Sequence, residues 1–153
     1  MTDHLLEEIR GGVAILTMNR PDRRNAMSTE MLLSMLEKLG RLSADESIGC
    51  VVLTGAGGAF CAGGDVKAMA AGEEFEAESL EAKTQQLRAV METSRLLHEM
   101  PKPTIAMVGG AAAGAGLSLA LSCDMRIAAA SAKFTTAFAK VGYSGDFGGS
   151  YYL

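Results

Sequence analysis

The stretch that decides the fold is Pro103–Asp124, PTIAMVGGAAAGAGLSLALSCD. It opens with Thr104–Val108, an apolar run with enough β-branched residues to indicate a buried strand. Four glycines among alanines follow in Gly109–Gly116, and the apolar Leu117–Leu121 comes next. Gly and Ala let a ligand come close to the backbone, and a helix starting near Leu117 would present free N–H groups that favour negative charge. The stretch is equally typical of an oxyanion site and of close strand–helix packing.

Two other interpretations of this stretch fail. No charge lies between Thr104 and Cys123, as in a membrane span, but its glycines, serines and proline make it weakly apolar and no comparable second span exists. A dinucleotide-binding G-x-G-x-x-G fingerprint would start at Gly114 and Gly116, but its third glycine position holds Leu119. We therefore expect neither a membrane span nor a dinucleotide site.

The composition fits one domain over residues 1–153, a length that can bury one ordinary core. A net charge of −4 leaves no basic footprint for a nucleic acid. Cys50, Cys61 and Cys123 are widely spaced among apolar residues, form no zinc or redox pattern, and predict reduced buried thiols in a cytoplasmic protein. The acidic start of the chain is unlike a signal peptide.

Strands and helices alternate along the rest of the chain. A hairpin is predicted around Gly11-Gly12, and a helix capped by Ser28 follows. The acidic stretch 72–81 predicts a solvated loop, and 131–138 an irregular connection. The other expected elements are strands over 48–54 and 125–130 and helices over 66–71 and 80–97. This alternation implies a mixed α/β domain.

A second glycine-rich loop occupies residues 55–65, GAGGAFCAGGD, directly after the strand predicted over 48–54. Two such loops, each following a strand, are more than close packing normally needs. Each can bring backbone N–H groups near a ligand atom. A third glycine-rich turn lies at 142–149.

Four blocks of this sequence resemble the N-terminal part of the enoyl-CoA hydratase/isomerase (crotonase) superfamily. They are Asn19-Arg20-Pro21 with Asn25-Ala26, Phe60–Asp65 (FCAGGD), Pro103–Asp124 and Gly145–Ser150 (GDFGGS). The resemblance spans nearly the whole chain and implies a crotonase-like ββα spiral core. Members normally continue into further helices that make trimer contacts and part of the coenzyme A site. The chain is thus expected to be a truncated member, incomplete at its C-terminus, from a homotrimer or hexamer.

The resemblance implies an acyl-CoA thioester enzyme without a metal or a separate cofactor, since the substrate carries the coenzyme A. The family holds the thioester oxygen between two backbone N–H groups, which match Gly64 and Ala115. Each such donor stabilises an enolate by roughly 3–4 kcal/mol. Arg23 and Arg24 fall where the family contacts coenzyme A, and their charge suits its phosphates. The other implied substrate-binding residues are Ala62, Asp65, Val66, Gly114, Ser118 and Phe138.

The sequence departs from the family at the acid/base positions. Hydratases of the family use two glutamates, and the matching positions here hold Ser118 and Phe138. Asp146 is the acidic residue placed to replace them. One carboxylate can shuttle a proton between two carbons or attack as a nucleophile, whereas water addition usually needs a second group. Alternatively, Asp146 caps a helix that begins at Phe147, and both roles can hold together.

Three functions stay open at this point. The first is an enzyme of the enoyl-CoA hydratase/isomerase type, which isomerises or hydrates a double bond in fatty-acid or related acyl-CoA metabolism. The second is a dehalogenase or thioesterase that uses Asp146 as nucleophile. The third is a non-catalytic subunit that binds acyl-CoA.

Overall fold

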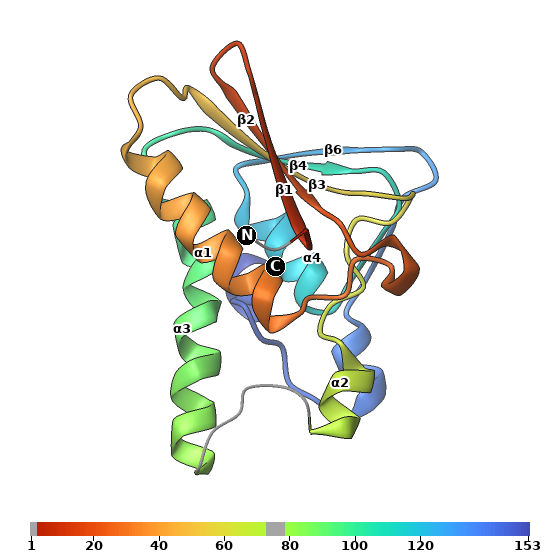
Figure 1. The fold of residues 1–153 in the computed structure, drawn as a ribbon. Coiled ribbons are helices and arrows are strands. Elements are labelled where there is room, and N and C mark those ends of the chain that lie inside the picture. The colour runs from red at the N-terminus through yellow and green to blue at the C-terminus, as the bar shows by residue number, and fades with distance from the viewer. Residues whose placement is uncertain (1–2, 73–78) are drawn as a thin grey trace.

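The main sheet has five strands in the order β1-β2-β3-β4-β6 (Figure 1). A computed structural model describes residues 3–72 and 79–153 of the chain. β1 and β2 form the predicted antiparallel hairpin, and the other neighbours pair in parallel. The strands are β1 (Leu5–Arg10), β2 (Val13–Met18), β3 (Cys50–Gly55), β4 (Thr104–Val108) and β6 (Met125–Ala128).

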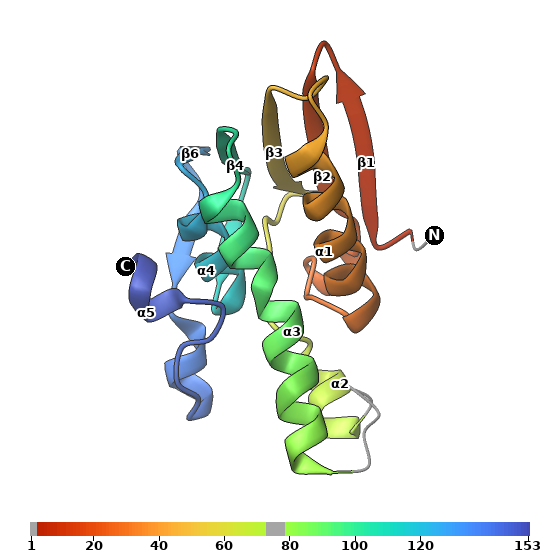
Figure 2. The ribbon, with the colours of Figure 1, turned by 90° about the vertical axis from the view of Figure 1, so that its left-hand side faces the viewer.

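Three helices lie below this sheet in the view of Figure 1: α1 (Thr29–Ala44), α3 (Leu80–Glu99) and α4 (Ala115–Ser122). Figure 2 shows α1 and α3 side by side. Alternate strand residues are fully buried, as Ala14, Leu16 and Met18 of β2 show. Ser28 caps α1 as predicted, because its Oγ accepts the Met31 N–H at 3.2 Å. The core therefore lies between the sheet and these helices.

A small parallel sheet of β5 (Ala111–Ala113) and β7 (Lys133–Thr135) was not predicted. Its strands fall in the glycine-rich stretch and in the expected irregular connection. Each strand has only three residues, too few for an alternating pattern, and the alanines of β5 have a low strand preference. The remaining elements are short: α2 (Val66–Ala71), α5 (Gly149–Tyr152) and the 3₁₀ turns Pro21–Arg23 and Ala137–Val141.

The mixed α/β class predicted from the alternating elements is confirmed. The three cysteines are free thiols, with Cys61 and Cys123 buried and Cys50 half-buried. Most of the expected acidic loop falls on 73–78, outside the described residues. Within 3–72 and 79–153, no helix combines the length and the apolar character needed to cross a membrane.

Candidate active site

Asn25 fixes the path of the glycine-rich loop after β3. Its side chain is fully buried, and its Nδ2 donates to the carbonyl oxygens of Ala56 at 2.8 Å and Ala59 at 2.9 Å. Its Oδ1 accepts the Arg20 N–H at 2.9 Å. A buried amide with these partners ties the turn before α1 to the loop.

Cys61 joins this loop to the second glycine-rich stretch. The N–H groups of Phe60 and Cys61 both donate to the Ala111 carbonyl at 3.0 Å, and the Ala113 N–H donates to the Cys61 carbonyl at 2.9 Å. These bonds join the first loop to β5 and fix the register of the two loops relative to each other.

The two loops contact each other at Gly63. Its φ is +94°, and a Cβ built there would lie 2.8 Å from the Ala113 oxygen and 3.4 Å from the Ala115 nitrogen. Only glycine fits this position. Gly64 and Ala115, the two residues expected to donate N–H groups to a substrate, therefore belong to directly contacting segments. Among the described residues, neither N–H donates a backbone hydrogen bond in a turn, loop or cap.

Ser118 and Phe138, at the two glutamate positions of the family, lie in one cluster with the third glycine-rich turn. A Cβ built on Gly149 would lie 2.5 Å from Ser118 Oγ and 3.9 Å from Phe138 Cε1. A Cβ built on Gly145 would lie 3.3 Å from Phe138 Cζ. Phe138 also reaches the start of α4, because a Cβ built on Gly114 would lie 3.9 Å from its backbone nitrogen.

Asp146 lies in this turn, and its side chain is partly buried. Its Oδ1 is buried, and the described residues offer that atom no hydrogen-bond partner. Burial raises the pKa of Asp146 above its ordinary value, against the lowering effect of its own backbone N–H. The predicted capping role is wrong: α5 begins at Gly149 after Gly148, and Asp146 contributes only its carbonyl, which accepts the Gly149 N–H at 2.9 Å. Phe147 has φ +47° and cannot start the helix.

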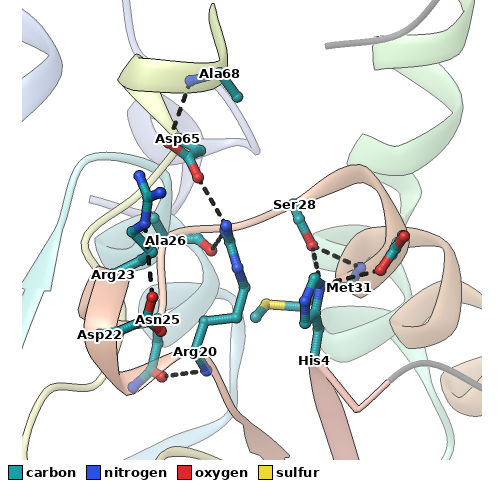
Figure 3. Close-up of polar contacts among 11 residues, drawn as sticks. His4, Arg20, Asp22, Arg23, Asn25, Ala26, Ser28, Met31, Asp65 and Ala68 are labelled. Atoms are coloured by element: carbon teal, nitrogen blue, oxygen red, sulfur yellow. Dashed lines mark hydrogen bonds and ion pairs between the residues drawn. The ribbon is translucent and has the colours of Figure 1, made fainter. Parts of the chain in front are cut away.

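Asp65 ends the first loop and forms an ion pair with Arg20 (Figure 3). Arg20 Nη2 donates to Asp65 Oδ2 at 2.9 Å, and Arg20 Nη1 donates to the Ala26 carbonyl at 2.7 Å. Asp65 Oδ1 caps α2 by accepting the Ala68 N–H at 3.3 Å. Asp65 is therefore directed at protein groups, with Arg20 as its main partner.

A cavity of about 480 Å³ is lined by both residues of this ion pair. It is lined by the cations Arg20, Arg23 and Lys67, by the carboxylates Glu30 and Asp65, and by His4, whose Nδ1 lies 2.8 Å from Ser28 Oγ (Figure 3). Neither Gly64 nor Ala115 lines this cavity. Cations and carboxylates therefore lie together next to the first loop.

The remaining predicted residues surround the first loop. Arg24 is exposed and outside the cavity lining, but its carbonyl accepts the Ala62 N–H at 3.0 Å. Val66 is exposed at the start of α2 and does not line the cavity.

Comparison with known proteins decides the family. The sequence pattern of the enoyl-CoA hydratase/isomerase family matches residues 8–153. The chain belongs to this family.

Relatives of different chemistry support the assignment. The chain is 41% identical over 153 residues to the 1,2-epoxyphenylacetyl-CoA isomerase of Escherichia coli K12, covering 100% of the chain and 58% of that protein. It is 37% identical to the 4-chlorobenzoyl coenzyme A dehalogenase-2 of Arthrobacter sp, covering 98% of the chain and 54% of that protein. The crystal structure of an enoyl-CoA hydratase from Polaromonas sp. JS666 matches with a TM-score of 0.87 and 38% identity, covering 97% of the chain and 56% of that one. The crotonase-like fold predicted from the sequence is thus confirmed, and the chain spans about half the length of these family members.

Sequence reasoning missed three residues around the cavity: Arg20, Lys67 and His4. Arg20 and Lys67 stand inside or next to family blocks, so their charge was a usable signal. His4 carries no signal, because only the pairing of β1 with β2 brings it near Ser28.

Proposed function

We propose that this chain carries the thioester site of an acyl-CoA enzyme that moves a double bond through a single carboxylate. The observation that carries the proposal is the contact of the two loops at Gly63, with Gly64 and Ala115 on its two sides. Two N–H donors aimed at one oxygen form an oxyanion hole, which stabilises negative charge as it develops on a thioester oxygen.

In this proposal Asp146 is the acid/base. Its carboxylate takes a proton from the carbon next to the thioester carbonyl, and the electron pair moves onto the oxygen held by Gly64 and Ala115. The same carboxyl group then returns the proton to the carbon of the original double bond that lies farther from the thioester. Burial raises the pKa of Asp146, which strengthens it as a base once it is ionised.

Ser118 and Phe138 favour isomerisation over hydration. Neither side chain can act as a carboxylate base, and the Phe138 ring lies against the turn that holds Asp146. Water addition would need a second acid/base group at one of these positions. A proton shuttle between two carbons needs only one.

The coenzyme A portion is proposed to lie along the cationic side of the first loop. Arg23 and Lys67 line the cavity there, and Arg24 lies beside Ala62. Guanidinium and ammonium groups suit the phosphates of coenzyme A. No metal or further cofactor is required by this proposal, because the substrate brings the coenzyme A.

The family also supports wider proposals for the whole protein. These are a homotrimeric or hexameric assembly, a cytoplasmic location and a role in fatty-acid or related acyl-CoA metabolism.

A second candidate is covalent catalysis by Asp146, as in dehalogenation. The Asp146 carboxylate has a buried oxygen, Oδ1, without a hydrogen-bond partner among the described residues, and a carboxylate can act as a nucleophile. One relative is a 4-chlorobenzoyl coenzyme A dehalogenase. The third candidate, an acyl-CoA-binding subunit without catalysis, has no observation of its own in its favour.

One experiment separates the three candidates. The full-length protein is incubated with crotonyl-CoA, 3-hexenoyl-CoA and 4-chlorobenzoyl-CoA, and products are followed by mass and absorbance. Isomerisation keeps the mass of 3-hexenoyl-CoA and adds the absorbance of a conjugated thioester. Hydration adds the mass of water, and dehalogenation releases chloride. Binding without turnover of any thioester would contradict the proposed enzyme.

A further inference from the structure

We propose that Cys61 is a positioning residue that sets the two substrate-facing N–H groups, and this inference rests on the proposed function. Its backbone makes two hydrogen bonds with β5, and its side chain makes a further bond inside its own loop: Cys61 Sγ accepts the Gly63 N–H at 3.5 Å. Cys61 therefore links the segment that carries Gly64 to the segment that carries Ala115.

The sulfur determines which N–H group of the first loop is left for a ligand. Gly63 is buried, so its N–H needs an acceptor within the protein. Because Cys61 Sγ supplies that acceptor, the next N–H along the chain, that of Gly64, remains available. Without the sulfur, the Gly63 N–H would compete for the substrate oxygen or turn the loop toward another acceptor.

The same residue also fixes the start of α4. A Cβ built on Gly116 would lie 2.4 Å from the Cys61 carbonyl oxygen and 2.7 Å from the Cys61 Cβ. The first turn of α4, which begins with Ala115, therefore packs directly on Cys61. A shift of Cys61 moves both expected donors relative to each other.

Cys61 acts in this role as a neutral thiol. It is fully buried, and burial raises the pKa of Cys61 to about 12, so the thiol keeps its proton at neutral pH. A protonated buried thiol is neither a nucleophile nor an acid/base, and its contribution is geometric.

The test compares Cys61→Ala and Cys61→Ser with Cys123→Ala in the full-length protein. Cys61→Ala removes the acceptor, and Cys61→Ser restores one. We expect Cys61→Ala to lower kcat about 10-fold with KM within about 2-fold, since small misplacements of catalytic groups cost up to 10²-fold. Cys61→Ser recovers most of that loss. Cys123 is a matched control, because it is also buried, directly after α4, and its Sγ bonds to the Leu119 carbonyl of that helix at 3.4 Å. Cys123→Ala lowers stability and leaves kcat unchanged.

A ligand-free readout keeps the inference separate from the proposed function. Hydrogen exchange at the Gly63 amide should be at least about 10-fold faster in Cys61→Ala than in the wild type, and intermediate in Cys61→Ser. Equal exchange in all three proteins would overturn the role of the sulfur, whatever the activity. If the wild type turns over no thioester but its Gly63 amide exchanges slowly, the proposed function is overturned and the hydrogen bond from Gly63 to Cys61 Sγ still stands. Equal kcat in Cys61→Ala and Cys123→Ala would overturn the positioning role.

Discussion

Arg20 Nη2 lies 2.9 Å from Asp65 Oδ2, and this pair joins the turn before α1 to the cap of α2. The side chains are only 16% and 10% exposed. Burial by itself would raise the pKa of Asp65, but hydrogen bonds from Arg20 and the Ala68 N–H outweigh it and keep that pKa below its ordinary value. The pair thus fixes the loop that carries Gly64.

Asp65→Asn is expected to lower the free energy of unfolding by about 3–5 kcal/mol, because it leaves the Arg20 guanidinium partly buried without its counter-charge. Chemical denaturation measures the loss. Asp22→Asn is the control: Asp22 is 78% exposed and lies 3.6 Å from Arg23, so its removal should cost less than about 1 kcal/mol. Equal losses in the two variants would contradict a structural role of the pair.

The same pair predicts a pH dependence of stability. The folded-state pKa of Asp65 is lowered, so its stabilising effect is complete above its unfolded pKa of about 3.9 and is lost as the pH falls through the folded pKa. The difference in unfolding free energy between the wild type and Asp65→Asn should therefore be constant above about pH 5 and shrink below about pH 4. Denaturation curves at several pH values test this, and a gap that widens in acid would contradict it.

Gly63→Ala should separate the two glycine-rich loops. Gly63 and Gly58 both have positive φ, +94° and +85°, but only Gly63 has backbone atoms where a Cβ would go. Gly58→Ala should cost only the backbone strain, about 1–2 kcal/mol. Gly63→Ala should cost about 1–3 kcal/mol more through overpacking. Unfolding free energies measure both, and only Gly63→Ala should also reduce thioester turnover.

Many of the strands and helices could be predicted because the sequence patterns that specify them are local. The β1–β2 hairpin turns on Gly11-Gly12, and α1 combines the Ser28 cap with a buried face at helical spacing. The strands β3 and β4 are short apolar runs. The family blocks pointed to Gly64 and Ala115, which the structure places on contacting segments.

The parts that could not be predicted depend on contacts distant in the chain. Arg20 and Asp65 are 45 residues apart, and either charge alone is typical of a solvated surface. The sheet of β5 and β7 forms from three alanines and three residues of a short connection, which are too short to show a strand pattern before they pair. The Asp146 cap failed because Gly148 and Phe147 take positive φ and delay α5 to Gly149.

Ser118 and Gly149 should be energetically coupled. Gly149→Ala puts a Cβ 2.5 Å from Ser118 Oγ but 3.6 Å from Ser118 Cβ. The substitution should therefore cost about 1–3 kcal/mol in the wild type and much less in a Ser118→Ala background. A double-mutant cycle of unfolding free energies measures the coupling. Additive losses would show that α5 does not pack on α4 through this contact.

Asp146→Asn in the full-length protein should lower turnover by roughly 10²–10⁴-fold, the usual effect of a positioned acid/base. Acyl-CoA affinity should change little, because the N–H groups of Gly64 and Ala115 remain. Burial raises the pKa of Asp146, so wild-type kcat/KM should rise with pH through a midpoint above the ordinary aspartate value, and the variant should lack that rise.

The free energy of unfolding gives an independent check on Asp146. A raised folded pKa means that the native state binds more protons than the unfolded chain, so wild-type stability falls as the pH rises from the unfolded to the folded pKa. Asp146→Asn should remove this fall and unfold at a higher denaturant concentration than the wild type at neutral pH. Normal turnover in Asp146→Asn would mean that another group moves the proton.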